Sequence, residues 1–215
     1  MNIIKVIRTC CMTLGTALLL AALFLVIYNI HEDREGGEQA EAVLSALKQE
    51  IPDNTEETTD TFPAAEAYDL YAAYEEPTEP AMPIAEIGGN SYLGYLSIPE
   101  LDVELPVLSE WSYAGLKQAP CRFKGDLNTN DLIICAHNYS SHFGRIHELN
   151  TGSRIYFTDV AGKQYPLSVI SLEVMPGTAL EMMQYGDADD WDLTLFTCTL
   201  SGQSRVIVRA ERVEE

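Results

Sequence analysis

An uncharged apolar segment near the N-terminus constrains this chain more than any other feature. Residues 9–30, TCCMTLGTALLLAALFLVIYNI, contain no Asp, Glu, Lys or Arg over 22 positions. At about 1.5 Å of rise per residue, a helix of this length spans a hydrocarbon core of roughly 30 Å. Lys5 and Arg8 precede the segment and acidic residues follow it, so residues 1–8 should be cytoplasmic and the rest extracytoplasmic. We therefore predict a single-pass signal anchor in the cell membrane.

A cleaved signal peptide is the alternative interpretation of residues 9–30. Such a peptide usually has an apolar region of about 7–15 residues, followed by a small-residue cleavage site of the A-x-A type. The segment here is longer, and the sequence YNIHEDREG at its end offers no A-x-A pattern. An uncleaved anchor is the favoured interpretation.

The chain is strongly acidic, with a formal net charge of −20, and the acidic residues are unevenly distributed. Residues 31–90 contain sixteen Asp and Glu against only Arg34 and Lys48. Such a segment repels itself, and this one contains Pro and Thr without a core-forming period. We expect residues 31–89 to form an acidic flexible spacer. The overall negative charge argues against nucleic acid as a partner.

Two parts of the spacer carry further hypotheses. Residues 38–51, EQAEAVLSALKQEI, have apolar residues at helical spacing and predict a short helix. A regulatory segment that folds back and docks Tyr68, Tyr71 and Tyr74 over a site is the alternative to a passive spacer. The passive spacer is favoured, because the composition is typical of a solvated chain.

The pattern changes to short apolar runs separated by turn residues in residues 90–215. Pro99 and Pro106 interrupt the first two runs, and residues 111–116 predict one short helix. The later predicted strands are residues 132–136, a hairpin within 153–175 that turns at 159–163, residues 193–198 and residues 204–212. Seven or eight short strands with one or two short helices predict an all-β domain, closed or nearly closed into a barrel.

Three residues at strand ends form the candidate catalytic set. Cys198 ends the apolar run LTLFTC, His137 follows the run LIICA, and Arg205 opens the next strand after a short loop. Cysteine chemistry needs a thiolate, a proton donor for the leaving group and a group that stabilises an oxyanion. Two strand ends and an adjoining strand start can meet at one rim of a barrel, so we predict that these residues converge.

The other cysteines and histidines supply the alternatives. An odd cysteine outside the cytoplasm is a candidate reactive thiol, whereas Cys121 and Cys135 either form a disulfide or pack separately. His142 and His147 compete with His137 for the acid/base role, but we expect them to be solvated, on a loop and on a short helix respectively.

Metal binding is a minor hypothesis. A zinc site would use Cys135, His137, His142 and His147, although their spacings do not follow the common zinc patterns. Asp187, Asp189 and Asp190 lie in an acidic run that could hold calcium. No cofactor is expected, with calcium as the alternative, because an acidic run is usually only solvated.

These motifs resemble the sortase family of Gram-positive cell-surface cysteine transpeptidases. The sequence TLFTC, residues 194–198, matches the TLxTC pattern of that family. AHNYSSHFGRIHEL, residues 136–149, is similar to the family segment with the histidine, and RVIVRAE, residues 205–211, to the strand with the arginine. GYLSIPELDVELPVL, residues 94–108, looks like the opening strands of sortase domains. The resemblance covers about residues 90–215.

The resemblance implies a sortase-like barrel and a two-step acyl transfer. Cys198 would attack an LPxTG-like sorting signal and form a thioester, which an amine of a peptidoglycan precursor would resolve. His137 would act as acid and base, and Arg205 would hold the substrate backbone or the oxyanion. Thr197 and Thr194 would contribute to substrate binding. A cysteine hydrolase that uses water, and an anchored module that binds without catalysis, are the alternatives.

Some departures from the family pattern bear on the class of sortase. Residues 31–89 contain no Asp-Pro-aromatic lid motif, and no second apolar span follows the domain before Glu215. Both features argue against a pilus polymerase. The segment PGTALEMMQYGDADDWD, residues 176–192, is too short for the long helix of one family class.

Overall fold

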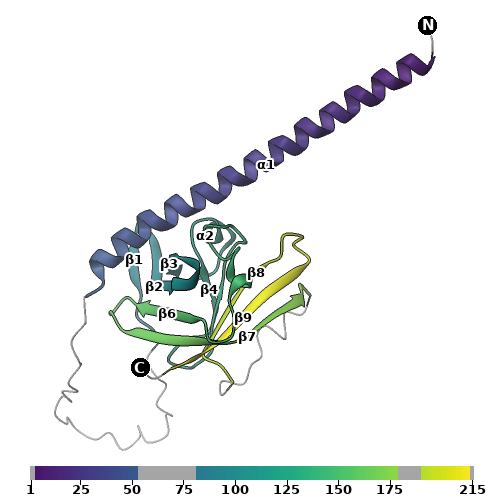
Figure 1. Ribbon diagram of the computed structural model, residues 1–215. Helices are drawn as coiled ribbons and strands as arrows, with labels where there is room; N and C mark the ends of the chain where they lie inside the picture. The colour runs from purple at the N-terminus through teal and green to yellow at the C-terminus, as the bar shows by residue number, and fades with distance from the viewer. Residues whose placement is uncertain (1–2, 53–80, 179–189, 214–215) are drawn as a thin grey trace, which may run out of the picture.

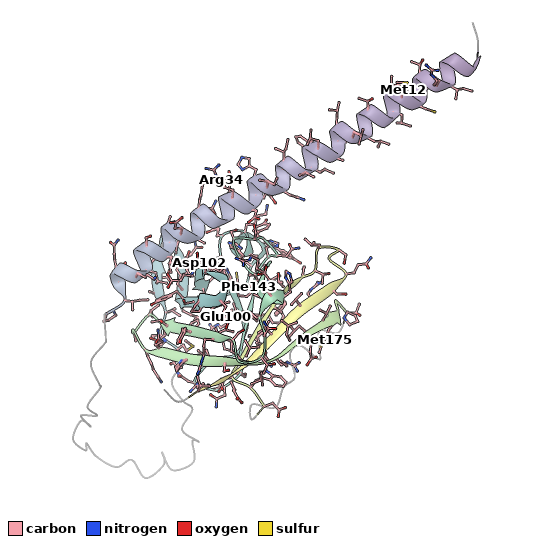
Figure 2. The ribbon with its side chains drawn as sticks, in the orientation of Figure 1. Met12, Arg34, Glu100, Asp102, Phe143 and Met175 are labelled. Carbon is pink, nitrogen blue, oxygen red and sulfur yellow. The ribbon has the colours of Figure 1, made fainter. Side chains whose placement is uncertain are left out.

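The computed structural model describes residues 3–52, 81–178 and 190–213. It consists of a β-barrel and one long N-terminal helix, α1 (Ile3–Glu50). The second half of α1 lies along the barrel, whereas the first half projects away from it (Figure 1). Met12, on the projecting half, is far from the barrel in Figure 2.

Nine strands form one sheet. They are β1 (Ala85–Ile87), β2 (Asn90–Ile98), β3 (Val103–Leu108), β4 (Cys121–Lys124), β5 (Leu132–Cys135), β6 (Arg154–Asp159), β7 (Gln164–Pro176), β8 (Leu193–Cys198) and β9 (Ser204–Arg212). Their order is β1-β2-β3-β4-β5-β8-β9-β7-β6, and an additional pairing of β2 with β6 closes eight of them into a barrel. The predicted all-β barrel is confirmed.

Short helical turns connect some of the strands in the described residues. They are η2 (Pro99–Leu101), α2 (Tyr113–Leu116) and η3 (Ile146–Glu148). α2 begins two residues after the predicted start, because the Ser112 hydroxyl accepts a hydrogen bond from the Gly115 N–H at 2.9 Å and caps the first turn. η3 lies in the segment where a short helix was expected.

The barrel interior is filled by alternate residues of the strands. In β8, Leu193 and Leu195 are fully buried, and in the neighbouring β9 Val208 and Ala210 face the same core. This alternation follows from the two-residue period of a strand. It also fixes which residues of β8 can reach the barrel surface and which cannot.

The structure corrects the prediction of a flexible spacer that starts at residue 31. Residues 31–50 continue α1 without a break, and Ala40, Leu44 and Leu47 on one face are buried against the barrel. Their spacing of four and three residues places them in one stripe of the helix. The short helix predicted within residues 38–51 is confirmed as the end of α1, but the acidic composition of the segment did not indicate that this helix continues the anchor or packs on the barrel.

The end of the predicted spacer is also packed on the barrel. Met82 is buried, its N–H donates to Asp126 at 2.7 Å, and β1 pairs with β2. The barrel unit therefore includes residues N-terminal to residue 90. Tyr68, Tyr71 and Tyr74, the residues of the docking hypothesis, lie outside the described residues.

Packing of α1 on the barrel gives a first prediction. Leu47 is fully buried in a cluster with Tyr92, Leu108 and Cys121. Leu47→Ala should lower the free energy of unfolding by about 2–5 kcal/mol, because it removes buried methyl groups and leaves a cavity. Urea unfolding of the full chain in detergent, followed by tryptophan fluorescence, measures this loss.

The control for Leu47→Ala is Gln49→Ala, which changes an exposed position on the same helix. A surface change of this kind should stay within about 0.5 kcal/mol of the wild type. Equal unfolding midpoints for Leu47→Ala and Gln49→Ala would contradict the packing of α1 on the barrel.

Candidate active site

The ends of β5 and β8 bring His137 and Cys198 to the same edge of the barrel. The two strands are parallel neighbours, with Cys135 opposite Phe196, and the Ala136 N–H donates to the Phe196 carbonyl at 3.2 Å. Continued by two residues, this register sets His137 beside Cys198. The predicted meeting of two strand ends at one rim is therefore present in the backbone.

Arg205 lies opposite Cys198 across the β8–β9 hairpin. The antiparallel register pairs the two residues directly, as the short connecting loop predicts. The guanidinium Nη1 of Arg205 donates to the carbonyls of Gly202 at 3.0 Å and Ser204 at 3.1 Å. The arginine side chain is thereby held over the loop that follows the cysteine.

Cys198 differs from the other two cysteines of the barrel. Its side chain is only partly buried, whereas Cys121 and Cys135 are buried as free thiols on the facing strands β4 and β5. Burial raises the pKa of the Cys121 thiol to about 11 and that of Cys135 further. Only a thiolate is a good nucleophile, so the environment of Cys121 and Cys135 favours inert thiols.

A cavity of about 550 Å³ opens beside Cys198. One wall comes from the end of β8 and the hairpin loop, including Thr197, Cys198 and Leu200. Other lining residues come from the segment after β5, including Asn138 and His147. A cavity of this volume lies within the usual range of ligand-binding sites.

His137 is not among the residues that line this cavity. Its ring stacks on the ring of Tyr139 with a centroid distance of 4.8 Å. Partial burial lowers the pKa of His137, the charge of Glu32 opposes this, and the charge of Lys117 adds to it. The imidazole is therefore mainly neutral near pH 7, which suits a group that both gives and accepts a proton.

The two rival histidines have different environments. His142 was expected to be solvated, but it is 1% exposed, and burial lowers its pKa to about 4. That expectation is wrong, because α1 covers the loop on which His142 lies. His147 is exposed as expected, lies on η3 and lines the cavity, with Nδ1 2.9 Å from the Gly144 carbonyl.

The two threonines of the TLFTC motif are not equivalent. Thr197 lines the cavity, and its hydroxyl donates to the Ala136 carbonyl at 2.9 Å, which ties the β8 end to the β5 end. Thr194 is fully buried and is not among the cavity-lining residues. Thr194 therefore does not reach the cavity in this structure, and a substrate-binding role for it stays a prediction.

Several residues of the cavity were not predicted from the sequence. Asn138 and Arg145 line it, and the Asn138 amide reaches the Thr199 carbonyl at 3.5 Å. Arg145 is held by Glu148 and by the Leu101 carbonyl. Both residues lie in the histidine segment, but no local pattern separates cavity residues from solvated ones in a loop.

The metal hypotheses find no support in the described residues. Across residues 3–52, 81–178 and 190–213, no group of three or more His, Cys, Asp and Glu is arranged to hold a metal ion. Asp187 and Asp189 of the calcium hypothesis lie outside this range, so only Asp190 is described.

The fold and the site define a small closed barrel with a partly buried cysteine over a cavity at its rim. The Sortase domain model matches residues 96–213, more than half of the chain, and the chain belongs to the sortase family of cysteine transpeptidases. No curated protein matches the chain.

Solved sortases share the fold. The chain is 24% identical to Clostridium perfringens sortase C with the C-terminal cell wall sorting motif, with a TM-score of 0.51 over 58% of this chain and 71% of that one. It is 18% identical to a Clostridium perfringens sortase D5 transpeptidase, with a TM-score of 0.53 over 60% and 83%. For sortase C1 from Streptococcus agalactiae the values are 24%, 0.51, 60% and 69%. At these identities the similarity establishes the fold alone.

Proposed function

We propose that this chain is a membrane-anchored cysteine transpeptidase that cleaves LPxTG-like sorting signals and transfers the protein to a cell-wall amine. The observation that carries the proposal is the position of Cys198, a partly buried thiol at a cavity, opposite Arg205 and beside the end of the strand that precedes His137. Family membership supports the reaction type. The sorting signal follows from the resemblance of the TLFTC segment.

The first half-reaction forms a thioester. His137 takes the proton of the Cys198 thiol as the sulfur attacks the carbonyl carbon of the Thr–Gly amide, and the C–N bond breaks as His137 passes that proton to the leaving amine. Arg205 stabilises the negative charge that develops on the carbonyl oxygen. A guanidinium has five N–H donors, so its anchoring to loop carbonyls through Nη1 is compatible with this role.

The second half-reaction resolves the thioester. An incoming amine attacks the same carbonyl carbon and His137 accepts its proton. As the carbon–sulfur bond breaks, His137 passes that proton to the sulfur, which restores the thiol. If water attacks instead, the product is a free acid and the enzyme is a hydrolase. The same residues serve both outcomes, so only the entering nucleophile distinguishes them.

The anchor supports a location at the outer face of the membrane. By length and composition α1 can cross a membrane, and its apolar part is wholly exposed in the structure. Lys5 and Arg8 favour a cytoplasmic N-terminus. Sorting-signal proteins and peptidoglycan precursors would then meet the enzyme on the extracytoplasmic side.

Product analysis tests the proposal. The full chain in nanodiscs is incubated with a panel of fluorogenic LPxTG-like peptides, with and without an added amine-terminated peptide. We expect cleavage, and a ligated product that appears only with the amine. Free acid alone under both conditions would establish the hydrolase, and a panel without turnover together with an unreactive Cys198 would establish a binding module.

A further inference from the structure

The anchor helix touches the loop that follows His137 at an unusually polar contact. The carboxylate of Asp33 accepts hydrogen bonds from the N–H groups of Ser140 at 3.0 Å and Ser141 at 3.1 Å. It also accepts from both serine hydroxyls, and the Ser141 hydroxyl lies 2.9 Å from the Asp33 carbonyl. One side chain of α1 thus fixes two consecutive residues of the histidine loop.

Two glycines of α1 allow this close approach. A Cβ on Gly37 would lie 2.9 Å from the Ser141 Cβ, and one on Gly36 would lie 3.0 Å from the Lys117 carbonyl and 3.3 Å from the Tyr139 ring. Glycine inside a helix costs about 1 kcal/mol relative to alanine. The two consecutive glycines therefore allow α1 to lie closer to the loop than other residues would.

Contacts within the loop connect its two serines to His137. Glu32 lies 3.4 Å from the Tyr139 hydroxyl, and the ring of Tyr139 stacks on His137. The Phe143 N–H donates to the His137 carbonyl at 3.2 Å, and the Gly144 N–H to the Tyr139 carbonyl at 2.8 Å. Because these bonds close the loop on itself, a shift of its serines also shifts the imidazole.

We propose that Asp33 is a positioning residue for His137, so that the membrane-anchor helix completes the active site. The inference rests on the proposed function, in which His137 is the acid and base. Asp33 lies three residues beyond the apolar segment, about 4.5 Å along the helix. Arg34, its neighbour, marks where α1 passes the barrel in Figure 2. The catalytic loop is therefore attached directly to the point where the chain leaves the membrane.

If Asp33 only held α1 on the barrel, its loss would lower stability, but other contacts already hold the helix. The helix is already held by Ala40, Leu44 and Leu47, which are buried in the barrel contact. Loss of the Asp33 carboxylate should therefore leave α1 docked and the barrel folded, while the histidine loop loses its fixed geometry. Catalysis, rather than stability, should report the change.

Asp33→Asn in the full chain in nanodiscs is the test. An amide has one acceptor oxygen, and its NH₂ group would face a serine N–H, so the loop should shift. We expect kcat to fall about 10–100-fold, since small misplacements of catalytic groups cost this much, with KM changed less than about 3-fold. Glu41→Gln, which removes an exposed acid of the same helix, should keep the wild-type kcat.

Two further variants make the test independent of one substitution. In Gly37→Ala the added Cβ would displace Ser141, so this variant should lower kcat as Asp33→Asn does. Alanine favours the helix, so the loss would not come from a weaker helix. In a His137→Ala background, Asp33→Asn should cause no further loss of single-turnover rate, because a positioning residue acts through the group it positions.

Unchanged kcat in both Asp33→Asn and Gly37→Ala, or a loss that adds to that of His137→Ala, would overturn the inference. A wild-type enzyme that turns over no peptide would instead overturn the proposed function, and with it the role of His137 on which the inference depends. The two failures are distinguished by the wild-type rate.

Discussion

Cys198→Ala should reduce peptide turnover at least ~10³-fold, to the uncatalysed background. No other cysteine of the barrel can replace it, because Cys121 and Cys135 are buried on neighbouring strands and their pKa values are raised. Cleavage of the fluorogenic panel, measured as kcat/KM for wild type and variant in nanodiscs, gives the ratio. Cys121→Ala should keep wild-type turnover and serves as the matched control.

The same contrast should appear in thiol chemistry without any substrate. With a pKa of about 11, Cys121 is about 0.1% thiolate at pH 8, so a methanethiosulfonate should label Cys198 in the folded protein and leave Cys121 unmodified. Peptide mass spectrometry after timed labelling resolves the sites. Residual turnover in Cys198→Ala, or equal labelling of the two cysteines, would assign the nucleophile elsewhere.

The strands around the site could be predicted because their signals are local. The run LTLFTC, a five-residue loop and the run beginning at Ser204 determine a hairpin, and a hairpin places Cys198 opposite Arg205. The apolar run before His137 similarly predicted a buried strand, which is β5. In each case the short apolar run and a nearby turn are enough to predict the strand.

The contacts of α1 could not be predicted in the same way. Ser141 and Asp33 are 108 residues apart in sequence, and neither residue has a local pattern that points to the other. The acidic composition of the segment favoured an extended spacer, although Ala40, Leu44 and Leu47 form a stripe. The burial of His142 follows from this long-range contact, so it too was missed.

The TLFTC motif was informative about the site but not about each of its residues. Leu193 and Leu195 of β8 face the barrel interior, so alternation puts Thr194 on the opposite face of the strand, where it is fully buried, whereas Thr197 lines the cavity. A motif match assigns a segment, whereas the packing decides which of its side chains reach a substrate. A substrate role for Thr194 would require it to face the cavity.

His137→Ala should lower kcat/KM about 10²–10⁴-fold, the usual contribution of a general acid–base group, whereas His147→Ala should change it far less. The two histidines occupy different places: His137 follows β5, whose register continues beside Cys198, whereas His147 lies on η3 and lines the cavity. The strand register favours His137, since two parallel neighbours hold the pair at a fixed separation.

The pH dependence of kcat/KM separates the two histidines. Burial lowers the pKa of His137, so the limb of the profile that this residue controls should lie below the ordinary histidine value of 6.5. Neutral His137 is needed to take the proton of the Cys198 thiol, so kcat/KM should fall as the pH falls through that pKa. His137→Ala should abolish this limb of the kcat/KM profile, whereas His147→Ala should leave the profile unchanged. If the limb survives in His137→Ala but disappears in His147→Ala, His147 is the acid/base residue. Asp33 would then position a residue that takes no part in catalysis.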